Sequence, residues 1–273
     1  MATLYIFGDE SGTMPINDTD KPFVAATVAV LDNPPVLIPG SDDDSKMVEI
    51  FSNLNIIPYI TVVKPFPGYG NTLKAKHGKM QVMARATRLV NGANARYLNE
   101  NGFDIRNWIW CHAMGQGIAN AVLHTVSTSS IDVVRVLLDR KTMSPSMRVF
   151  FKEMVVNHVG NWTKEFVAKY RMAYPSEVSL WEDRARFSSK SVILNWSDES
   201  KELEKQFGLK LADRLARKIY QAQMTGQPGI ESMFKAAGFD NIVIDISKLV
   251  IRLDRRVVDN FKRNTRLPEP RDH

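Results

Sequence analysis

The sequence predicts an α/β fold, because short runs of β-branched and aromatic residues alternate with longer stretches of helical periodicity. Three of the short runs come early and two come later, at residues 3–7, 23–31, 56–63, 131–139 and 191–196. Helical patterns occupy residues 72–98, 115–126, 144–159 and 201–223. The expected order is three strands, a helix, a strand, a helix, a strand and a helix, with some additions.

The composition is that of an ordinary globular chain. It has 273 residues, of which 44% are hydrophobic, and a formal net charge of +6. A single cysteine, Cys111, excludes an internal disulfide framework and suits a reducing compartment. No apolar stretch reaches the ~18 residues of a membrane helix, and the first residues do not resemble a signal peptide. We therefore expect a cytoplasmic protein without a membrane segment, whose basic charge is compatible with a nucleic-acid partner.

Two acidic residues follow the first strand. Residues 3–7 lead into the sequence Gly-Asp-Glu-Ser-Gly, which is typical of a turn. Asp9 and Glu10 are thus expected where a buried strand meets a turn. Desolvating two like charges costs several kcal/mol unless a partner compensates them, and a divalent cation is one such partner. A plain turn, in which Asp is common, is the alternative.

The next two strands flank a polar segment. Residues 23–31 are almost continuously apolar, as in a strand that is buried on both faces. Residues 32–47 contain three prolines and the acidic run 42–44, which predicts an exposed loop; a metal site in the acidic run is the less favoured alternative. Residues 56–63 form the third strand, and Pro58 favours either an edge position or a late start for it.

The helical stretch at residues 72–98 is basic. No acidic residue occurs in it before Glu100. Its positive side chains are Lys74, Lys76, Lys79, Arg85, Arg88 and Arg96. A solvated amphipathic helix and a surface that faces a polyanion both account for this pattern.

The central part of the chain contains the clearest strand. Residues 108–112 suit a strand or a buried connector, and residues 115–126 a short helix. Residues 131–139 are rich in valine and end at Asp139, as in a central strand. Ser144 and Pro145 then begin a helix, with Ser at the cap and Pro at the first position.

The helix expected at residues 201–223 places an acid beside small residues. Ala212 and Ala216 share its apolar face, and Asp213 lies at the edge of that face. Small residues let a helix approach a sheet closely, so Asp213 could point into a cleft. A surface ion pair with Arg217, four residues later, is the alternative.

A boundary is expected at residues 225–229, which read Thr-Gly-Gln-Pro-Gly. Residues 1–224 would form the core, with an insertion around 64–130. Residues 225–273 would form a basic appendage that packs on the core or extends it.

Three local motifs carry a resemblance to a known family. They are Asp-Glu-Ser-Gly at residues 9–12, Leu-Asp-Arg at 138–140, and Gly-Leu-Lys-Leu-Ala-Asp at 208–213. Together they resemble the mainly microbial domain-of-unknown-function family 3800, over roughly residues 3–222. The resemblance implies a ribonuclease H-like fold, in which three antiparallel strands are extended by two parallel strands. It implies no particular substrate.

Three carboxylates in such a fold suggest a metal-dependent nuclease. Phosphodiester hydrolysis can use two divalent metals roughly 4 Å apart, and Mg²⁺ or Mn²⁺ prefers oxygen ligands. Asp9 would bridge both metals, Asp139 and Asp213 would each hold one side, and Glu10 would be a further ligand. The expected contacts to DNA or RNA phosphates are Lys74, Lys76, Lys79, Arg85 and Lys141.

Three other functions remain open at this point. Residues 8–13 are close to the Asp-x-Asp-Gly-Thr signature of haloacid-dehalogenase-like phosphatases, although Ser11 replaces the second acid. A catalytically silent nucleic-acid-binding module and a protein-interaction role are the others. The arrangement of Asp9, Asp139 and Asp213 in space discriminates among them.

Overall fold

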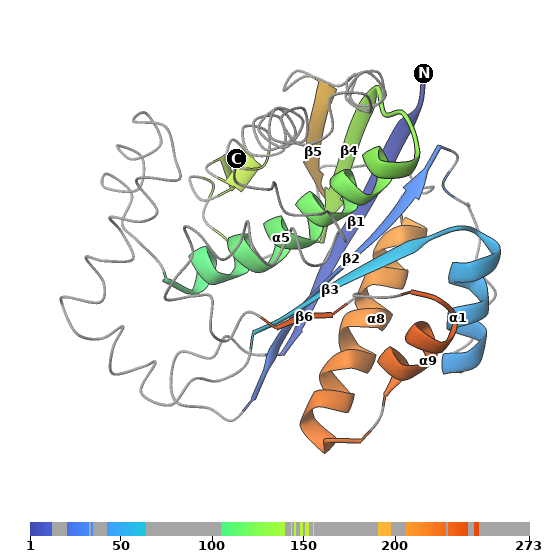
Figure 1. Cartoon of the computed structure of the whole chain (residues 1–273). Helices are drawn as coiled ribbons and strands as arrows, with labels where there is room; N and C mark the ends of the chain where they lie inside the picture. The colour runs from blue at the N-terminus through green and yellow to red at the C-terminus, as the bar shows by residue number, and fades with distance from the viewer. Residues whose placement is uncertain are drawn as a thin grey trace, which may run out of the picture.

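A mixed β-sheet forms the centre of the protein in the computed structural model (Figure 1). The structure describes residues 1–12, 21–32, 34, 43–63, 105–139, 143, 145, 148–149, 151–152, 155, 191–197, 206–227, 229–239 and 243–245. The α/β class and the mixed sheet predicted from the sequence are confirmed.

The sheet has the strand order β5-β4-β1-β2-β3-β6. Its strands are β1 (Thr3–Gly12), β2 (Phe23–Leu31), β3 (Ile57–Val63), β4 (Val133–Leu138), β5 (Val192–Trp196) and the short β6 (Val243–Asp245). The first three strands pair antiparallel with one another. Strand β4 pairs parallel with β1, β5 pairs parallel with β4, and β6 pairs parallel with β3 at the other edge. The carboxyl ends of β1, β4 and β5 therefore lie at the same end of the sheet.

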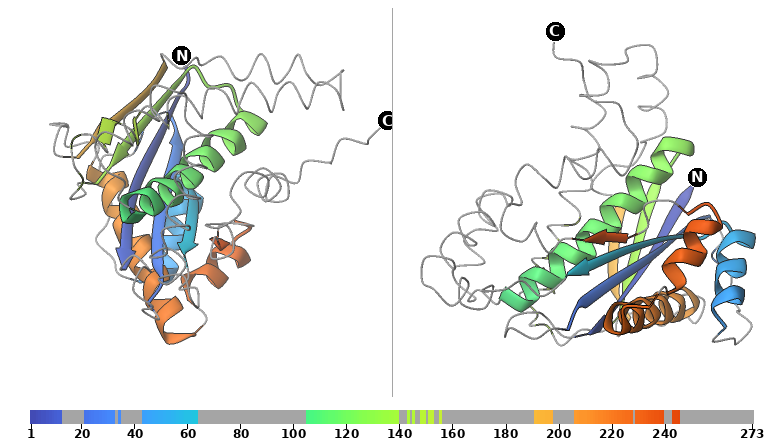
Figure 2. Two further views of the ribbon diagram at one scale, coloured as in Figure 1. Left: turned by 90° about the vertical axis from the view of Figure 1, so that its left-hand side faces the viewer. Right: turned by 60° about the horizontal axis from the view of Figure 1, so that its bottom comes forward.

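Helices cover both faces of the sheet (Figure 2). Helix α5 (Ile105–Thr128) crosses one face, mainly over β2 and β3. Helix α8 (Gln206–Thr225) packs on the other face, over β1 and β2. Helices α1 (Asp44–Asn53) and α9 (Ile230–Ala236) lie beside α8 and contact each other. None of the described helices is long and apolar enough to cross a membrane.

The alternation of side chains along β1 assigns its residues to the two faces. A Cβ on Gly8 would meet Met114 of α5, whereas the ring of Phe7 lies against Gly208 of α8. Because neighbouring residues of a strand point to opposite faces, Phe7 and Asp9 share the α8 face, and Gly8 and Glu10 share the α5 face. Strand β2 is buried along nearly its whole length, as predicted, because both of its faces are covered.

The core on the α8 face joins residues that are far apart in the sequence. Fully buried side chains from the sheet, α1, α8 and α9 form one cluster, which includes Phe7, Phe51, Ile60, Leu215 and Phe234. Burying each large apolar side chain stabilises the fold by roughly 1.5–3 kcal/mol. Part of the segment 225–273 is thus continuous with the core, through α9 and through the pairing of β6 with β3.

The first strand is longer than predicted. It continues through Gly12, which pairs with Phe23 of β2, instead of ending at Phe7 in a turn. Asp9 and Glu10 are consequently residues of a paired strand. The expected turn was wrong because the Gly and Ser residues signal a turn only locally, and the antiparallel ladder to β2 extends past them.

Two further expectations are corrected by the helices. Helix α1 begins inside the segment 32–47, which we expected to be a loop; the side chain of Asp43 caps it and accepts a hydrogen bond from the Ser45 backbone N–H at 2.9 Å. The acidic run therefore contributes a helix cap. Residues 108–112, expected to be a strand or a connector, belong to α5. The helix expected at 72–98 and the beginning of the expected insertion, residues 64–104, lie outside the described residues.

Candidate functional site

Asp9 and Asp139 lie side by side where β1 and β4 run parallel. Gly8 is in register with Leu138, and the backbone N–H of Asp139 donates to the carbonyl of Gly8 at 3.0 Å. The pairing thus continues one residue beyond β4. Residues in register on neighbouring strands point to the same face, so both carboxylates lie on the α8 face of the sheet.

Ser197 extends this row onto β5. Its backbone N–H donates to the carbonyl of Leu138 at 2.8 Å, and its Oγ donates to Oδ1 of Asp139 at 2.8 Å. One oxygen of the Asp139 carboxylate is thereby held in place. Our sequence reasoning did not single out Ser197, although it directly follows the strand predicted at 191–196, much as Asp139 ends its own strand.

Asp213 lies level with Asp9 along the strand direction. Gly208 of α8 is against Phe7, and Tyr220 is against Gly12, so α8 and β1 run in the same sense. From Gly208 to Asp213 the helix rises about 7 Å. From Phe7 to Asp9 the strand rises about the same distance.

The flank of α8 that carries Asp213 faces away from α1. Lys218 Nζ binds Asp44 Oδ1 of α1 at 2.8 Å, which fixes the opposite flank of the helix. At about 100° per residue, Asp213 is some 140° around the axis from Lys218. Its side chain is exposed, whereas Ala212 and Ala216 are fully buried against the sheet, as their small size predicted. Asp213 therefore lies on the exposed flank of α8 that faces away from α1, and its charge acts on Asp9.

Burial and charge make Asp9 an unusual carboxyl group. Its side chain is only 9% exposed. Loss of solvent is the largest cause that raises its pKa, to about 7, and the charges of Asp139, Glu10 and Asp213 raise the pKa further. A hydrogen bond from the Glu10 backbone N–H to Asp9 Oδ1, 2.7 Å long, acts in the opposite direction. A cation beside Asp9 would relieve this cost.

Glu10 is on the other face of the sheet. Its Oε2 accepts a hydrogen bond from Trp110 Nε1 of α5 at 2.8 Å, and the Trp110 ring stacks on Trp196 with centroids 5.9 Å apart. Glu10 could reach the same face as Asp9 only if a turn began at Asp9, and the strand continues instead. The structure thus separates the Glu10 side chain from Asp9 and Asp139 and gives it a hydrogen-bond partner on α5.

The donor set suits a hard divalent cation. Asp9 and Asp139 present carboxylate oxygens, the ligands that Mg²⁺ and Mn²⁺ prefer, and Asp213 adds negative charge at the same level. Within the described ranges, no group of three or more His, Cys, Asp or Glu residues is close enough to hold a metal ion. The described part of the site is therefore a close pair of carboxylates with a third acid nearby.

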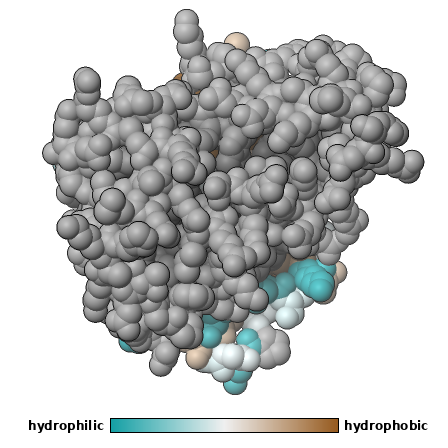
Figure 3. Space-filling view, turned by 60° about the vertical axis from the view of Figure 1, so that its left-hand side comes forward, coloured by the Kyte–Doolittle hydropathy of each residue, from teal (hydrophilic) through white to brown (hydrophobic). Residues whose placement is uncertain are grey.

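The predicted phosphate contacts are not placed by the structure. Lys74, Lys76, Lys79, Arg85 and Lys141 all lie outside the described residues. In the part of the surface that Figure 3 colours, hydrophilic and hydrophobic residues are mixed. The exposed large hydrophobic residues of the described ranges are scattered over different elements, as Met1, Leu54, Val149 and Met224. We therefore find no hydrophobic docking surface in the described ranges.

Comparisons of the chain with models of protein families, with curated proteins and with solved structures find no match.

Proposed function

We propose that the protein is a metal-dependent nuclease that hydrolyses the phosphodiester bonds of DNA or RNA. The observation that carries this proposal is the pair of adjacent carboxylates, Asp9 within β1 and Asp139 directly after β4, where the parallel pairing of the two strands ends. One of them is almost fully buried with a pKa raised to about 7, and the exposed Asp213 lies level with it. Structural acids seldom carry such an uncompensated cost, and perturbed carboxyls cluster at functional sites.

The strand order supports the proposal independently. Three antiparallel strands extended by two parallel strands, in the order β5-β4-β1-β2-β3, are what the resemblance to the ribonuclease H-like fold implies. The resemblance to domain-of-unknown-function family 3800 rests on the segments that contain Asp9, Asp139 and Asp213. Membership of that family is part of the proposal.

Each residue has a distinct role in the proposed reaction. When bound, Mg²⁺ or Mn²⁺ would supply an activated water and stabilise the leaving oxygen. Asp9, on the central strand β1, would lose its proton and would hold the cation together with Asp139. Asp139 would offer its Oδ2, since Oδ1 is held by Ser197. Asp213 would close the site from α8, at the side open to solvent.

A cleavage assay tests the proposal. Purified protein is incubated with labelled single-stranded and double-stranded DNA and RNA, in Mg²⁺, in Mn²⁺ and in EDTA. We expect metal-dependent cleavage of at least one substrate, and loss of most of that activity in Asp9→Asn, Asp139→Asn and Asp213→Asn. Cleavage that persists in EDTA, or in Asp9→Asn, would contradict the proposal.

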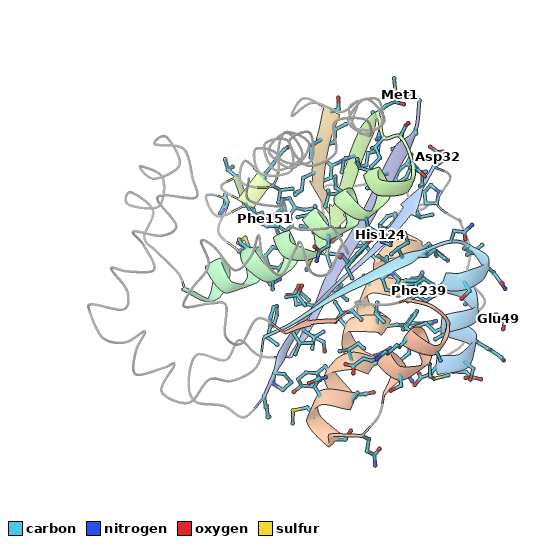
Figure 4. All side chains as sticks on the ribbon, viewed as in Figure 1. Met1, Asp32, Glu49, His124, Phe151 and Phe239 are labelled. Atoms are coloured by element: carbon cyan, nitrogen blue, oxygen red, sulfur yellow. The ribbon has the colours of Figure 1, made fainter. Side chains whose placement is uncertain are left out.

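Asp32→Asn is the matched control. Asp32 lies beside the start of β1, near Met1 (Figure 4), and its Oδ1 accepts a hydrogen bond from the Thr3 backbone N–H. Thr3 is six residues before Asp9, about 20 Å along the strand. Asp32 has φ 58°, a conformation that Asn also tolerates, and the Asn amide keeps an acceptor. This variant removes a carboxylate without touching the site, so it should cleave like the wild type.

A further inference from the structure

Trp110 of α5 connects the ends of two strands on the face of the sheet opposite the candidate site. Its Nε1 donates a hydrogen bond to Glu10 Oε2 of β1 at 2.8 Å. Its ring stacks on that of Trp196 of β5, with centroids 5.9 Å apart and 29° between the ring planes. Strand β4 lies between β1 and β5 in the sheet, so Trp110 bridges two strands that do not pair with each other.

The two residues that Trp110 contacts are immediate neighbours of site residues. Glu10 directly follows Asp9, and Trp196 directly precedes Ser197. Successive residues of a strand point to opposite faces. Trp110 therefore holds these strand ends on the α5 face, while Asp9 and Ser197 project from the α8 face. Any shift of Glu10 or Trp196 moves its neighbour in the site with it.

The site lies where the pairing of β4 ends. Asp139 and Ser197 directly follow β4 and β5. Their backbone N–H groups donate to the carbonyls of Gly8 and Leu138 and close the ladder there. Strand ends open more readily than strand centres, because fewer hydrogen bonds and contacts hold them. A group that holds the backbone from outside the sheet therefore matters most at this place.

Trp110 is itself fixed relative to the sheet. It is fully buried. Met114 and Gly117 follow it at i+4 and i+7, on the same face of α5. A Cβ on Gly8 would lie 2.6 Å from Met114 Sδ, and a Cβ on Gly117 would lie 2.5 Å from Thr27 Oγ1. Helix α5 thus packs closely on β1 and β2, and Trp110 is a fixed point from which the strand ends can be held.

We propose that Trp110 is a positioning residue for the divalent cation, because it holds the ends of β1 and β5 and so fixes Asp9 relative to Asp139. This inference rests on the cation site of the proposed function and adds to it a residue that touches no ligand. It also gives Glu10 a role that fits its place on the α5 face. The Glu10 carboxylate ties β1 to α5, and the cation is left to the residues of the other face.

The affinity for Mn²⁺, measured by isothermal titration calorimetry at pH 8, tests this role. Trp110→Phe keeps a ring beside Trp196 and removes the N–H donor. It should weaken Mn²⁺ binding about tenfold, as the loss of groups that support metal ligands does. The matched control is Phe151→Leu. Phe151 is fully buried and its ring lies edge-on to that of Trp110, with centroids 5.1 Å apart (Figure 4). This control loses packing in the same cluster and keeps the hydrogen bond to Glu10, so urea unfolding should show a less stable protein that binds Mn²⁺ like the wild type.

Two substitutions of Glu10 separate the hydrogen bond from the charge. Both Glu10→Gln and Glu10→Met remove the negative charge, but only Gln keeps an oxygen that accepts from Trp110 Nε1. Glu10→Gln should therefore bind Mn²⁺ about tenfold more tightly than Glu10→Met. Trp110→Phe should add little to the loss in Glu10→Met, because both changes remove the same hydrogen bond. If Trp110→Phe does not fold, the two Glu10 variants decide the question alone.

Wild-type affinity in Trp110→Phe would overturn this inference, as would an equal loss in Phe151→Leu or equal affinities of the two Glu10 variants. A wild type that binds no Mn²⁺ would overturn it together with the proposed function. Hydrolysis of bis(p-nitrophenyl) phosphate by the wild type in Mn²⁺ tests the proposed function separately. A protein whose Mn²⁺ affinity depends on Trp110 and that hydrolyses nothing would refute the nuclease and leave the positioning role standing. Hydrolysis with an unchanged Mn²⁺ affinity in Trp110→Phe would refute the positioning role alone.

Discussion

Ionisation of the buried Asp9 carboxyl costs free energy in the folded protein. Its folded pKa of about 7 compares with an ordinary value of 3.8, and burial is the main cause. A difference of this size corresponds to roughly 4 kcal/mol between the two protonation states. The folded state binds this proton more firmly than the unfolded state does. Raising the pH from the ordinary pKa of 3.8 to the folded pKa of about 7 therefore favours unfolding.

The first prediction is a pH dependence of the metal-free protein. In EDTA, the contribution of Asp9 should lower the free energy of unfolding as the pH rises from about 4 to about 7, and should then level off. Asp9→Asn should lack this component and be more stable than wild type at pH 8, by up to a few kcal/mol. Urea unfolding at a series of pH values measures it.

Asp32→Asn should keep the wild-type pH dependence, since it changes a carboxylate at the other end of β1. If Asp9→Asn were instead less stable than wild type at pH 8, the hydrogen bond from the Glu10 backbone N–H would be the dominant interaction of Asp9. The residue would then be a structural acid.

The second prediction concerns Ser197, which orients Asp139. Removing the hydroxyl in Ser197→Ala should weaken Mn²⁺ binding by about tenfold, because groups that orient a ligand carboxylate contribute on this scale. Ser197→Thr keeps the hydroxyl and should retain most of the affinity. Thermal shifts at increasing Mn²⁺ concentration provide the measurement. Identical Mn²⁺ titrations for the Ala variant and wild type would show that Asp139 needs no such support.

At the scale of elements, the distance between α8 and β1 depends on one glycine. A Cβ on Gly208 would lie 2.1 Å from ring carbons of Phe7. In an unhindered helix, Gly→Ala stabilises by about 1 kcal/mol. Here the overlap forces the helix away from the sheet, and with it Asp213.

The third prediction is that Gly208→Ala destabilises the protein, by about 1–3 kcal/mol in urea unfolding, in spite of its better helix propensity. Gln221→Ala, on the exposed side of the same helix, should be neutral or slightly stabilising. Phe7→Leu should recover part of the loss when combined with Gly208→Ala, and the double-mutant cycle isolates this coupling. Additive effects of the two substitutions would mean that the contact is not the cause.

The sequence predicted those elements whose signal is local. The valine-rich run of β4 and the continuous apolar run of β2 were found near their observed bounds. Helix α1 was missed because the prolines and acids before it dominate the composition, although Asp43 in that acidic run is its cap. The first residues of α5 were missed because Trp108, Ile109 and Trp110 suit a buried strand as well as a buried helix.

The site was predictable only in part, for a similar reason. Asp9 and Asp139 were recognisable as acids at or beyond strand ends, but their adjacency depends on the parallel register of β1 and β4. The separation of Glu10 depends on how far β1 continues, which its pairing with β2 decides. Ser197 has no local signal beyond its place after β5. Gly208 belongs to a quoted motif, yet its contact with Phe7 is a property of the packed structure.

At the scale of the whole molecule, the sheet gathers distant parts of the chain. Residue 9 lies in β1, residues 139 and 197 directly follow β4 and β5, and residue 213 lies on α8, which packs over β1 and β2. None of these contacts survives unfolding, so a ligand that needs all of them binds the folded protein alone. Such a ligand must then stabilise the fold by mass action.

The last prediction follows from that linkage. At a Mn²⁺ concentration about 100 times its Kd, the fold should gain about 2.7 kcal/mol. For a chain of this size that is a rise in Tm of roughly 5–10 °C. The rise should vanish in Asp9→Asn, shrink in Asp139→Asn and Asp213→Asn, and be complete in Asp32→Asn. Because the Asp9 proton, with a pKa of about 7, must leave before the cation binds, the wild-type rise should also be larger at pH 8 than at pH 6. A rise of equal size in Asp9→Asn, or at both pH values, would place the cation elsewhere and remove Asp9 from the proposed reaction.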